Sequence, residues 1–321
     1  MKILITGIHG FVGSNLVQSL KGENVLYGLD IISPKKEGVE KTFSWNDLYD
    51  RNIPTVDAII HLAGKAHDTK NQSLAQTYFD INTGLTQKVF DYFLSSSATK
   101  FIFFSSVKAA ADSVQGEFLT EDVVPTPKGP YGKSKIIAEE YIQKMLKHVQ
   151  HDGKGDEKDV YILRPCMIHG PGNKGNLNLL YNLVKKGIPW PLGAFENRRS
   201  FTSIDNLCYV VSGLLTKEVP SGIYHMSDDE SLSTNELIEV ICYVMGRKAH
   251  IWNIPKGLME FAASLGGILH LPLNPERLRK LTENYVASNA KIKKALGIDV
   301  MPVRARDGFI KTISSFIVSN K

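Results

Sequence analysis

The chain has 321 residues, of which 43% are apolar, and its 38 basic and 33 acidic residues leave a net charge of +5. This length suits one large domain or two closely joined domains, and the mild, scattered positive charge argues against nucleic-acid binding. No stretch is apolar enough to span a membrane, no signal-peptide pattern opens the chain, and the three cysteines lack the spacing of a zinc site. We therefore expect a cytoplasmic protein with no nucleic-acid, membrane or metal partner.

The first half of the chain alternates short apolar runs with amphipathic segments, as in repeated β-α-β units around a parallel sheet. The run at 56–60 lacks polar alternation, which is typical of a strand covered on both faces. The patterns predict strands at 2–6, 24–30, 41–45, 56–62, 100–105 and 159–163. They predict helices at 11–21, 73–95 and 131–148, and an exposed loop at 148–159.

The pattern changes after Pro165: proline and glycine are dense between Gly170 and Gly193, and helical patterns dominate beyond about residue 230. We predict an α/β fold, in which a Rossmann-type doubly wound parallel sheet carries a smaller, mainly helical C-terminal domain that binds the substrate. The two domains are expected at 1–170 and 171–321, with a strand at 222–226 returning to the sheet.

The segment that comes nearest to the apolar composition of a membrane span is 257–273, but it contains Glu260 and His270. Its apolar residues recur at helical spacing, at Leu258, Phe261, Leu265 and Leu269. This spacing favours a helix packed on the core over a helix lying on a membrane surface.

Glycines follow the first strand at positions 7, 10 and 13 and open the first helix. The first permits a tight turn, the second lets the backbone approach a pyrophosphate, and the third lets the helix pack on the strand. The N-terminus of that helix then faces the phosphates. This dinucleotide-binding turn comprises Gly7, Gly10, Phe11, Val12 and Gly13.

Asp30 ends the second strand, 17 residues after Gly13, where a carboxylate accepts hydrogen bonds from the adenosine ribose. A carboxylate there also repels a 2′-phosphate, which favours NAD over NADP, although Lys35 and Lys36 lie close enough to offset this. We therefore predict NAD as the cofactor.

Three further segments are candidates for contact with the cofactor. Asp47 and Leu48, after the third strand, border the adenine unless they form a plain turn. The small residues of Leu62-Ala63-Gly64 follow the fourth strand, where a cofactor passes close to the backbone. Asn82 either satisfies backbone groups near the active site or caps a local kink in its helix.

Tyr131 and Lys135 lie four residues apart in a predicted helix, so they share one face, and Pro130 is well placed to begin that helix. A nearby ammonium is expected to lower the pKa of the tyrosine, which then handles the proton of an alcohol. Lys135 is also a candidate to bind the nicotinamide ribose. Ser106, at the end of a strand, is placed to bind the substrate hydroxyl, with Ser105 as the alternative.

Other residues carry no clear catalytic pattern. No GxSxG elbow surrounds Ser105 and Ser106, so a nucleophilic hydrolase is not indicated. His61, His67 and His169 are isolated, and we interpret them as ordinary polar residues or at most as neighbours of the substrate.

Together these residues resemble the extended short-chain dehydrogenase/reductase family, in its NAD-dependent sugar epimerase/dehydratase branch. The resemblance covers nearly the whole chain and includes GIHGFVGSNL (7–16), FIFFSSVK (101–108), PYGKSK (130–135), LRPCMIHGPGNKGN (163–176) and NRRSFTSIDNL (197–207). It implies catalytic roles for Ser106, Tyr131 and Lys135, and substrate contacts at Ser106, Lys108, Asn176 and Arg199. Arg199 would grip the nucleotide diphosphate, with its neighbour Arg198 as the alternative.

Departures from the family pattern reduce the number of reactions that the resemblance allows. Sugar 4,6-dehydratases place an acidic pair where this chain has Val107 and Lys108, so dehydration is not expected. UDP-galactose 4-epimerases usually carry an asparagine where this chain has Met167. The SSVK and GPGNKGN runs are more similar to enzymes of bacterial surface-polysaccharide synthesis, both 4-epimerases and the 4-ketoreductases of the UDP-N-acetylquinovosamine dehydrogenase type.

The resemblance thus implies interconversion of hydroxyl and keto groups at C4 of a UDP-hexose or its N-acetylamino or 6-deoxy derivative. Epimerase and ketoreductase both stay open, as do a reductase of non-nucleotide alcohols and a non-catalytic NAD-binding regulator. By analogy with the family, the helices at 73–95 and 131–148 would pair in a homodimer.

Overall fold

The computed structural model describes residues 1–66, 74–151, 158–173, 175–269 and 273–319. His67 lies outside the described residues. Among those that are described, no helix combines the length and the hydropathy that crossing a bilayer requires.

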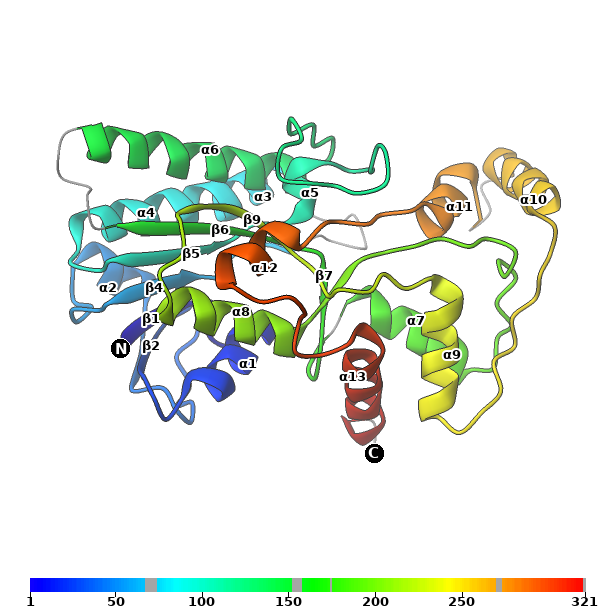
Figure 1. The fold of residues 1–321 in the computed structure, drawn as a ribbon, viewed down its shortest axis with the longest axis horizontal. Helices are drawn as coiled ribbons and strands as arrows, with labels where there is room; N and C mark the ends of the chain where they lie inside the picture. Colours follow the sequence, from blue (N-terminus) through cyan, green and yellow to red (C-terminus); the bar gives the residue numbers. More distant parts are fainter. Residues whose placement is uncertain (67–73, 152–157, 174, 270–272, 320–321) are drawn as a thin grey trace.

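A seven-stranded sheet in which every neighbouring pair is parallel forms the centre of the molecule (Figure 1). The strands are β1 (Lys2–Thr6), β2 (Val25–Leu29), β3 (Lys41–Phe43), β4 (Ala58–His61), β5 (Lys100–Phe104), β6 (Asp159–Pro165) and β9 (Gly222–Met226). Their order is β3-β2-β1-β4-β5-β6-β9, so the direction of winding reverses between β1 and β4. This is the doubly wound Rossmann order, and the predicted α/β fold is confirmed.

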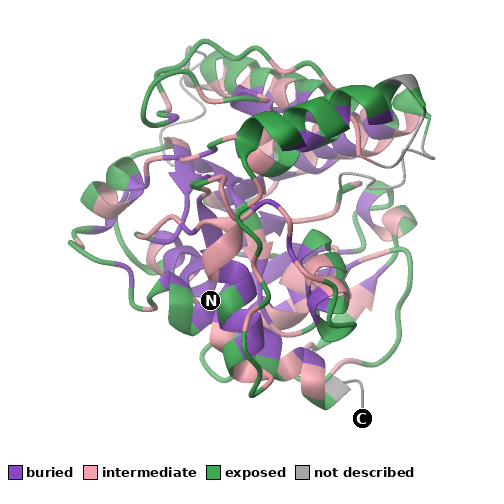
Figure 2. Cartoon of the chain, turned by 90° about the vertical axis from the view of Figure 1, so that its right-hand side faces the viewer, coloured by how far each residue is buried: buried purple, intermediate pink, exposed green. Residues whose placement is uncertain are grey.

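The sheet is covered on both faces because successive side chains of a strand point in opposite directions. In β1, Ile3 and Ile5 pack in one core with α1 (Phe11–Leu20), α8 (Ile204–Thr216) and α12 (Ala290–Leu296). Leu4 packs in the opposite core with α4 (Leu85–Ser95) and α6 (Pro130–His151). Figure 1 shows α4 and α6 above the sheet and α1 and α8 below it, and Figure 2 shows the burial of the strands between them.

Within the first 100 residues, two local structures differ from the sequence prediction. The strand expected at 41–45 ends at Phe43, because Ser44 caps the short helix α2 (Trp45–Tyr49) in a reciprocal capping box with Asp47. The helix expected at 73–95 consists of α3 (Ala75–Tyr78), a π-helical turn η1 (Phe79–Gly84) and α4. Such π-turns inside helices occur frequently at functional sites.

A second core gathers elements from the C-terminal half, with Tyr181, Phe201, Ile241 and Phe309 among its buried members. The helices are α7 (Asn176–Lys185), α9 (Thr234–Val244), α10 (Lys256–Ile268), α11 (Pro275–Thr282) and α13 (Ala305–Ser319). A small parallel sheet of β7 (Met167–His169) and β8 (Phe201–Ser203) lies between the two cores.

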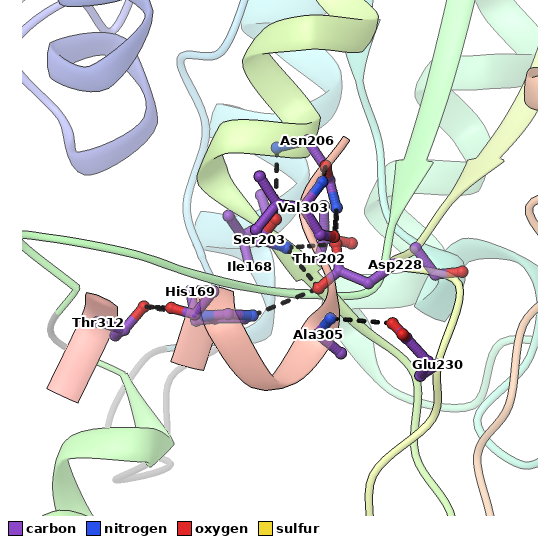
Figure 3. Close-up of polar contacts among 12 residues, drawn as sticks. Ile168, His169, Thr202, Ser203, Asn206, Asp228, Glu230, Val303, Ala305 and Thr312 are labelled. Carbon is purple, nitrogen blue, oxygen red and sulfur yellow. Dashed lines mark hydrogen bonds and ion pairs between the residues drawn. The ribbon is translucent and has the colours of Figure 1, made fainter. Parts of the chain in front are cut away.

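The buried carboxylate of Asp228 fastens this small sheet to its neighbours (Figure 3). It accepts hydrogen bonds from the backbone N–H of Ser203 and the side-chain amide of Asn206, and it lies 3.5 Å from Nε2 of His169. Nδ1 of His169 lies 3.0 Å from the Thr312 hydroxyl, so the same network reaches α13. His169 is therefore a buried structural residue, consistent with the prediction of an ordinary polar role.

The prediction for 257–273 was wrong in one respect. A helix forms there, but Leu258, Phe261 and Leu265 are exposed rather than packed on the core. The helix instead buries the opposite, smaller face through Met259 and Ala263.

One buried ion pair ties α6 to the sheet. The Arg164 guanidinium on β6 donates to the Glu139 carboxylate, with Nη2 to Oε2 at 2.6 Å and Nε to Oε1 at 3.0 Å. The Ser105 hydroxyl, at the end of β5, donates to the same carboxylate. Both charged residues are at most 1% exposed, so each depends on the other for compensation of its charge.

We expect Glu139→Ala to lower the free energy of unfolding by about 3–5 kcal/mol, because it leaves the Arg164 guanidinium buried without a counter-charge. The double variant Glu139→Leu/Arg164→Met should recover most of that loss, since apolar side chains replace both charges. Urea unfolding of the three proteins measures both effects. Equal stability of the single and double variants would show that the charge pairing is unimportant.

Candidate active site

The glycine turn lies at the carboxyl end of β1, at the switch point of the sheet where ligands of such folds bind. Gly7 has φ +67°, which favours glycine, and a Cβ there would meet the Ala63 backbone nitrogen at 3.0 Å. A Cβ on Gly13 would meet the Gly7 carbonyl oxygen at 2.5 Å. The turn therefore accepts no side chain at these two positions, and α1 begins directly after it with Phe11 and Val12.

Asp30 lies beside this turn, as the sequence predicted for a ribose-binding carboxylate. Its two oxygens accept from the backbone N–H groups of His9, at 3.0 Å, and Ile31, at 2.8 Å. Lys36 donates to the Ser14 hydroxyl at 2.7 Å; burial lowers its pKa, and Asp30 partly opposes that shift. The carboxylate and the turn fit an adenosine ribose and a pyrophosphate, as NAD requires.

The loop after β4 is held by a chain of buried hydrogen bonds. The Thr6 hydroxyl accepts from the backbone N–H of Ala63 at 2.9 Å and lies 2.7 Å from Nδ1 of His61. Nε2 of His61 lies 3.0 Å from the Thr86 hydroxyl. Burial lowers the pKa of His61 to about 3, so the imidazole is neutral and serves as a connector. This fixes Leu62, Ala63 and Gly64 beside the glycine turn.

Asn82, in the π-helical turn, joins this loop to α6. Its side-chain oxygen accepts from the Lys65 N–H at 2.7 Å, and its nitrogen donates to the Lys65 carbonyl at 3.2 Å and to the Ser134 hydroxyl at 3.0 Å. Of the two roles that the sequence left open, the structure thus has Asn82 satisfying backbone groups next to Gly64. A Cβ on Gly64 would meet Asn82 Oδ1 at 2.9 Å and Lys135 Nζ at 3.3 Å, so these groups pack tightly together.

Helix α6 carries Tyr131 and Lys135 on one face, and the structure places Tyr131 beside Ser106 and Lys135 beside the end of β5. The Ser106 hydroxyl hydrogen-bonds to the Tyr131 phenol, while the Lys135 ammonium donates to the Phe104 carbonyl at 2.8 Å. The Tyr131 ring also meets Tyr78 edge to face, with 6.2 Å between ring centroids. Because the Ser105 hydroxyl is bound to Glu139 instead, Ser106 is the serine that reaches Tyr131.

The pKa of Tyr131 differs from the sequence prediction. We expected the Lys135 ammonium to lower it, but it is raised, because burial disfavours the phenolate more than the Ser106 hydrogen bond favours it. Burial likewise lowers the pKa of Lys135 to about 8, although Glu139 partly opposes this. In this structure the tyrosine is therefore a protonated acid at neutral pH.

Lys108 and Arg199 place two cations close to each other. The Lys108 ammonium donates to the Asp112 carbonyl at 2.9 Å and lies 4.1 Å from the centroid of the Tyr285 ring. The Arg199 guanidinium donates to the carbonyl oxygens of Lys280 and Glu283. Arg199 is also close enough to lower the pKa of Lys108, a shift that burial dominates. This pair of cations suits a diphosphate.

The remaining predicted residues lie in less informative places. Asp47 caps α2 with its side chain, and Leu48 packs in the core below α4. Asn176 is exposed at the first turn of α7. Arg198 is exposed, whereas Arg199 is half-buried. The cofactor role of Asp47 and Leu48 and the substrate role of Asn176 stay predictions.

Sequence reasoning missed the residues that hold these loops in place. Asn15 donates to the Phe11 and Pro171 carbonyls and so ties the glycine turn to the loop after β7. Thr6, Thr86 and Ser134 were not singled out either. The only signal available was their polarity within otherwise apolar segments, because the partners that join them to other elements lie 25 to 156 residues away along the chain.

The doubly wound sheet and the glycine turn at its switch point are those of enzymes that bind a dinucleotide. The chain belongs to the NAD dependent epimerase/dehydratase family, whose sequence profile matches residues 3–226. The predicted resemblance and the predicted cofactor, NAD, are thereby confirmed.

Relatives along nearly the whole chain include a UDP-glucose 4-epimerase of Vibrio cholerae, 28% identical over 99% of this chain and 96% of the relative. An N-acetyl-alpha-D-glucosaminyl-diphospho-ditrans,octacis-undecaprenol 4-epimerase of Escherichia coli O157:H7 is 26% identical over 91% of this chain and 84% of its own.

Solved structures share the fold over both full chains. They include MoeE5 in complex with UDP-glucose and NAD, with a TM-score of 0.77 at 18% identity, and a UDP-glucuronic acid 4-epimerase from Bacillus cereus in complex with NAD, with a TM-score of 0.73 at 21% identity. At this level of identity the likeness shows the fold and no more.

The burial of Lys135 predicts how the free energy of unfolding depends on pH. Its pKa is about 8 in the folded protein and 10.5 as the ordinary value, so between these pH values the unfolded chain binds more protons and stability rises with pH. From about pH 8 to about pH 10.5, wild type should gain about 3 kcal/mol of unfolding free energy relative to Lys135→Met. Urea unfolding across this range measures the difference, and a relative loss would contradict the assignment.

Proposed function

We propose that this protein interconverts a hydroxyl and a keto group at C4 of a UDP-linked hexose or its N-acetylamino or 6-deoxy derivative. The observation that carries the proposal is the hydrogen bond from Ser106 to Tyr131, with Lys135 buried on the same face of α6. These groups lie at the carboxyl edge of the sheet, beside the glycine turn.

Each residue has a distinct part in this chemistry. NAD, when bound, accepts the hydride from the sugar carbon or returns it. Ser106 orients the C4 oxygen, and Tyr131 gives that oxygen a proton during reduction and takes it away during oxidation. During oxidation, the positive charge of Lys135 stabilises the phenolate form of Tyr131. Lys135 is also placed to bind the nicotinamide ribose. Arg199 and Lys108 hold the diphosphate side of the substrate.

Between the two reactions left open by the sequence, we put 4-epimerisation first. The Vibrio cholerae relative, which is similar to this chain over 99% of its length, is named as a UDP-glucose 4-epimerase, and this supports 4-epimerisation. Met167, where UDP-galactose 4-epimerases usually carry asparagine, argues for a sugar other than galactose. A 4-ketoreductase uses the same three residues for the second half of the reaction and is the alternative. Either activity fits surface-polysaccharide synthesis, and three buried free cysteines fit a cytoplasmic setting.

A second substrate class is a sugar diphosphate carried by a polyprenol instead of uridine. The name of the Escherichia coli relative supports it, as does an exposed apolar helix, α10, next to the helix whose backbone holds Arg199. Turnover of this substrate without turnover of UDP-sugars would replace the first choice.

A homodimer through α4 and α6 is also part of the proposal. Tyr141 on α6 donates to Asp91 on α4 at 2.6 Å, so the two helices form a joined outer layer of the kind that pairs with its copy. Ile137, on α6, is 40% exposed there.

The first test combines cofactor content with a tyrosine variant. Protein purified and then denatured should release close to one NAD per chain if it is an epimerase, which keeps its cofactor through both half-reactions. Tyr131→Phe should retain this NAD and lose turnover of UDP-sugars by at least about 100-fold, because the proton carrier is gone.

Tyr141→Phe is the matched control, because it removes a phenol hydroxyl from the same helix at a distance from Ser106. An empty protein that binds added NADH reversibly would indicate the ketoreductase. Full activity of Tyr131→Phe would contradict the role of Tyr131 as proton carrier. A wild type inert toward all nucleotide sugars would support the non-catalytic regulator instead.

The diphosphate role predicts the effect of Arg199→Ala. Loss of charge-assisted hydrogen bonds to phosphate should weaken UDP binding about 10- to 100-fold in titration calorimetry, with NAD content unchanged. Arg198→Ala, the exposed neighbour, is the control and should leave the affinity unaltered. If neither variant changes UDP affinity, a reductase of non-nucleotide alcohols becomes the better proposal.

A further inference from the structure

Helix α10 presents apolar side chains to solvent along one face. Leu258, Phe261 and Leu265 are 58%, 61% and 43% exposed, and Leu269, just after the helix, is 64% exposed. These positions follow one another at intervals of three and four residues, so they form one stripe. Among the residues of this helix whose burial is described, the buried ones are Met259 and the small residues Ala263 and Gly266. The larger apolar face is therefore the outer one, the reverse of an ordinary surface helix.

The helix stands at one end of the molecule. α10 packs against α11, where a Cβ on Gly267 would meet Pro275 at 3.2 Å, and Figure 1 places this pair at the end of the long axis. Figure 2 turns that end toward the viewer and shows its foremost helix as largely exposed. A scattered exposed leucine needs no explanation, but a continuous stripe at a protruding end marks an interaction surface.

The size of the stripe argues against a stable protein partner. Four large side chains at about half exposure leave about 400 Å² of apolar surface. A stable protein interface buries about 800 Å² on each partner. A helix that rests in a lipid surface has no such requirement, because lipid tails surround each protruding side chain individually.

The charges around the stripe fit an anionic surface. Helices α10 and α11 together carry four basic residues, Lys256, Arg277, Arg279 and Lys280, and two acidic ones, Glu260 and Glu276. All six are exposed. Exposed Trp252 precedes α10, and aromatic residues favour the boundary between water and lipid. Lys280 is paired with Glu276 at 2.6 Å, and the two helices together keep an excess of two positive charges. An apolar stripe on a helix pair with excess basic charge is the composition of a segment that lies in a membrane interface.

We propose that α10 and α11 dock this protein peripherally on an anionic lipid bilayer. The side chains of Leu258, Phe261, Leu265 and Leu269 enter the boundary between headgroups and acyl chains. The basic residues of α11 lie near the lipid phosphates. This revises our expectation that the chain has no membrane partner, and it requires no spanning segment.

The docking surface adjoins the candidate substrate site. Arg199 donates to the backbone carbonyls of Lys280 and Glu283, so the end of α11 forms part of the surroundings of the proposed diphosphate site. Docking would bring that site close to the lipid surface. The proposal concerns binding alone and does not rest on the proposed reaction, so the two can fail separately.

Vesicle sedimentation of the full chain tests the proposal. Wild type should sediment with vesicles of equimolar phosphatidylcholine and phosphatidylglycerol, and less with phosphatidylcholine alone or at high salt, because the basic residues then lose their partners. The triple variant Leu258→Ser/Phe261→Ser/Leu265→Ser should bind the anionic vesicles at least about tenfold more weakly.

The matched control is Leu179→Ser/Val300→Ser/Val318→Ser, which removes three exposed apolar side chains from other elements and should bind like wild type. Thermal unfolding and NAD content establish that both triple variants are folded. Absence of wild-type binding to either vesicle, or equal binding by both triple variants, overturns the proposal. A wild-type dimer that the α10 variant alone converts to a monomer also overturns it, since a second copy then covers the stripe.

Discussion

The buried pair of Glu139 and Arg164 sets the position of α6, and most of the site depends on that helix. Two charges this far from water are stable together only if neither moves, because separation exposes each to an uncompensated desolvation cost. The pair therefore fixes α6 against β6, and the Ser105 hydroxyl extends the attachment to β5. Tyr131 and Lys135 lie two turns and one turn before Glu139 on the same face of α6, so this contact also sets their positions.

Burial away from water shifts the pKa values of the titratable groups in the candidate site. Lys135 is 5% exposed, His61 is fully buried, and Tyr131 is half-buried beside Ser106. Burial favours the neutral form of each, so the imidazole acts as a fixed connector and the phenol as an acid. The same burial makes the ammonium of Lys135 costly, and its bond to the Phe104 carbonyl limits that cost.

The C-terminal half completes the site through backbone as much as through side chains. The segment around Arg199 lies between Leu232 and Tyr285, with hydrogen bonds from backbone to backbone on both sides. This places the guanidinium against the carboxyl end of α11 and close to Lys108. Relatives with solved structures share the fold at 21% identity or less, so the fold alone does not specify the sugar.

Patterns local in the sequence determined much of this protein. Strand periodicity, the spacing of the glycines and the interval between Tyr131 and Lys135 act over a few residues, so they predicted the sheet, the turn and the shared helix face. The tertiary structure alone decided which groups meet. It set Ser106 rather than Ser105 beside Tyr131, raised a pKa that we expected to fall, broke one predicted helix with a π-turn at Asn82, and turned the apolar face of α10 outward. Burial and long-range hydrogen bonds produce these features, and neither is encoded in the spacing of neighbouring residues.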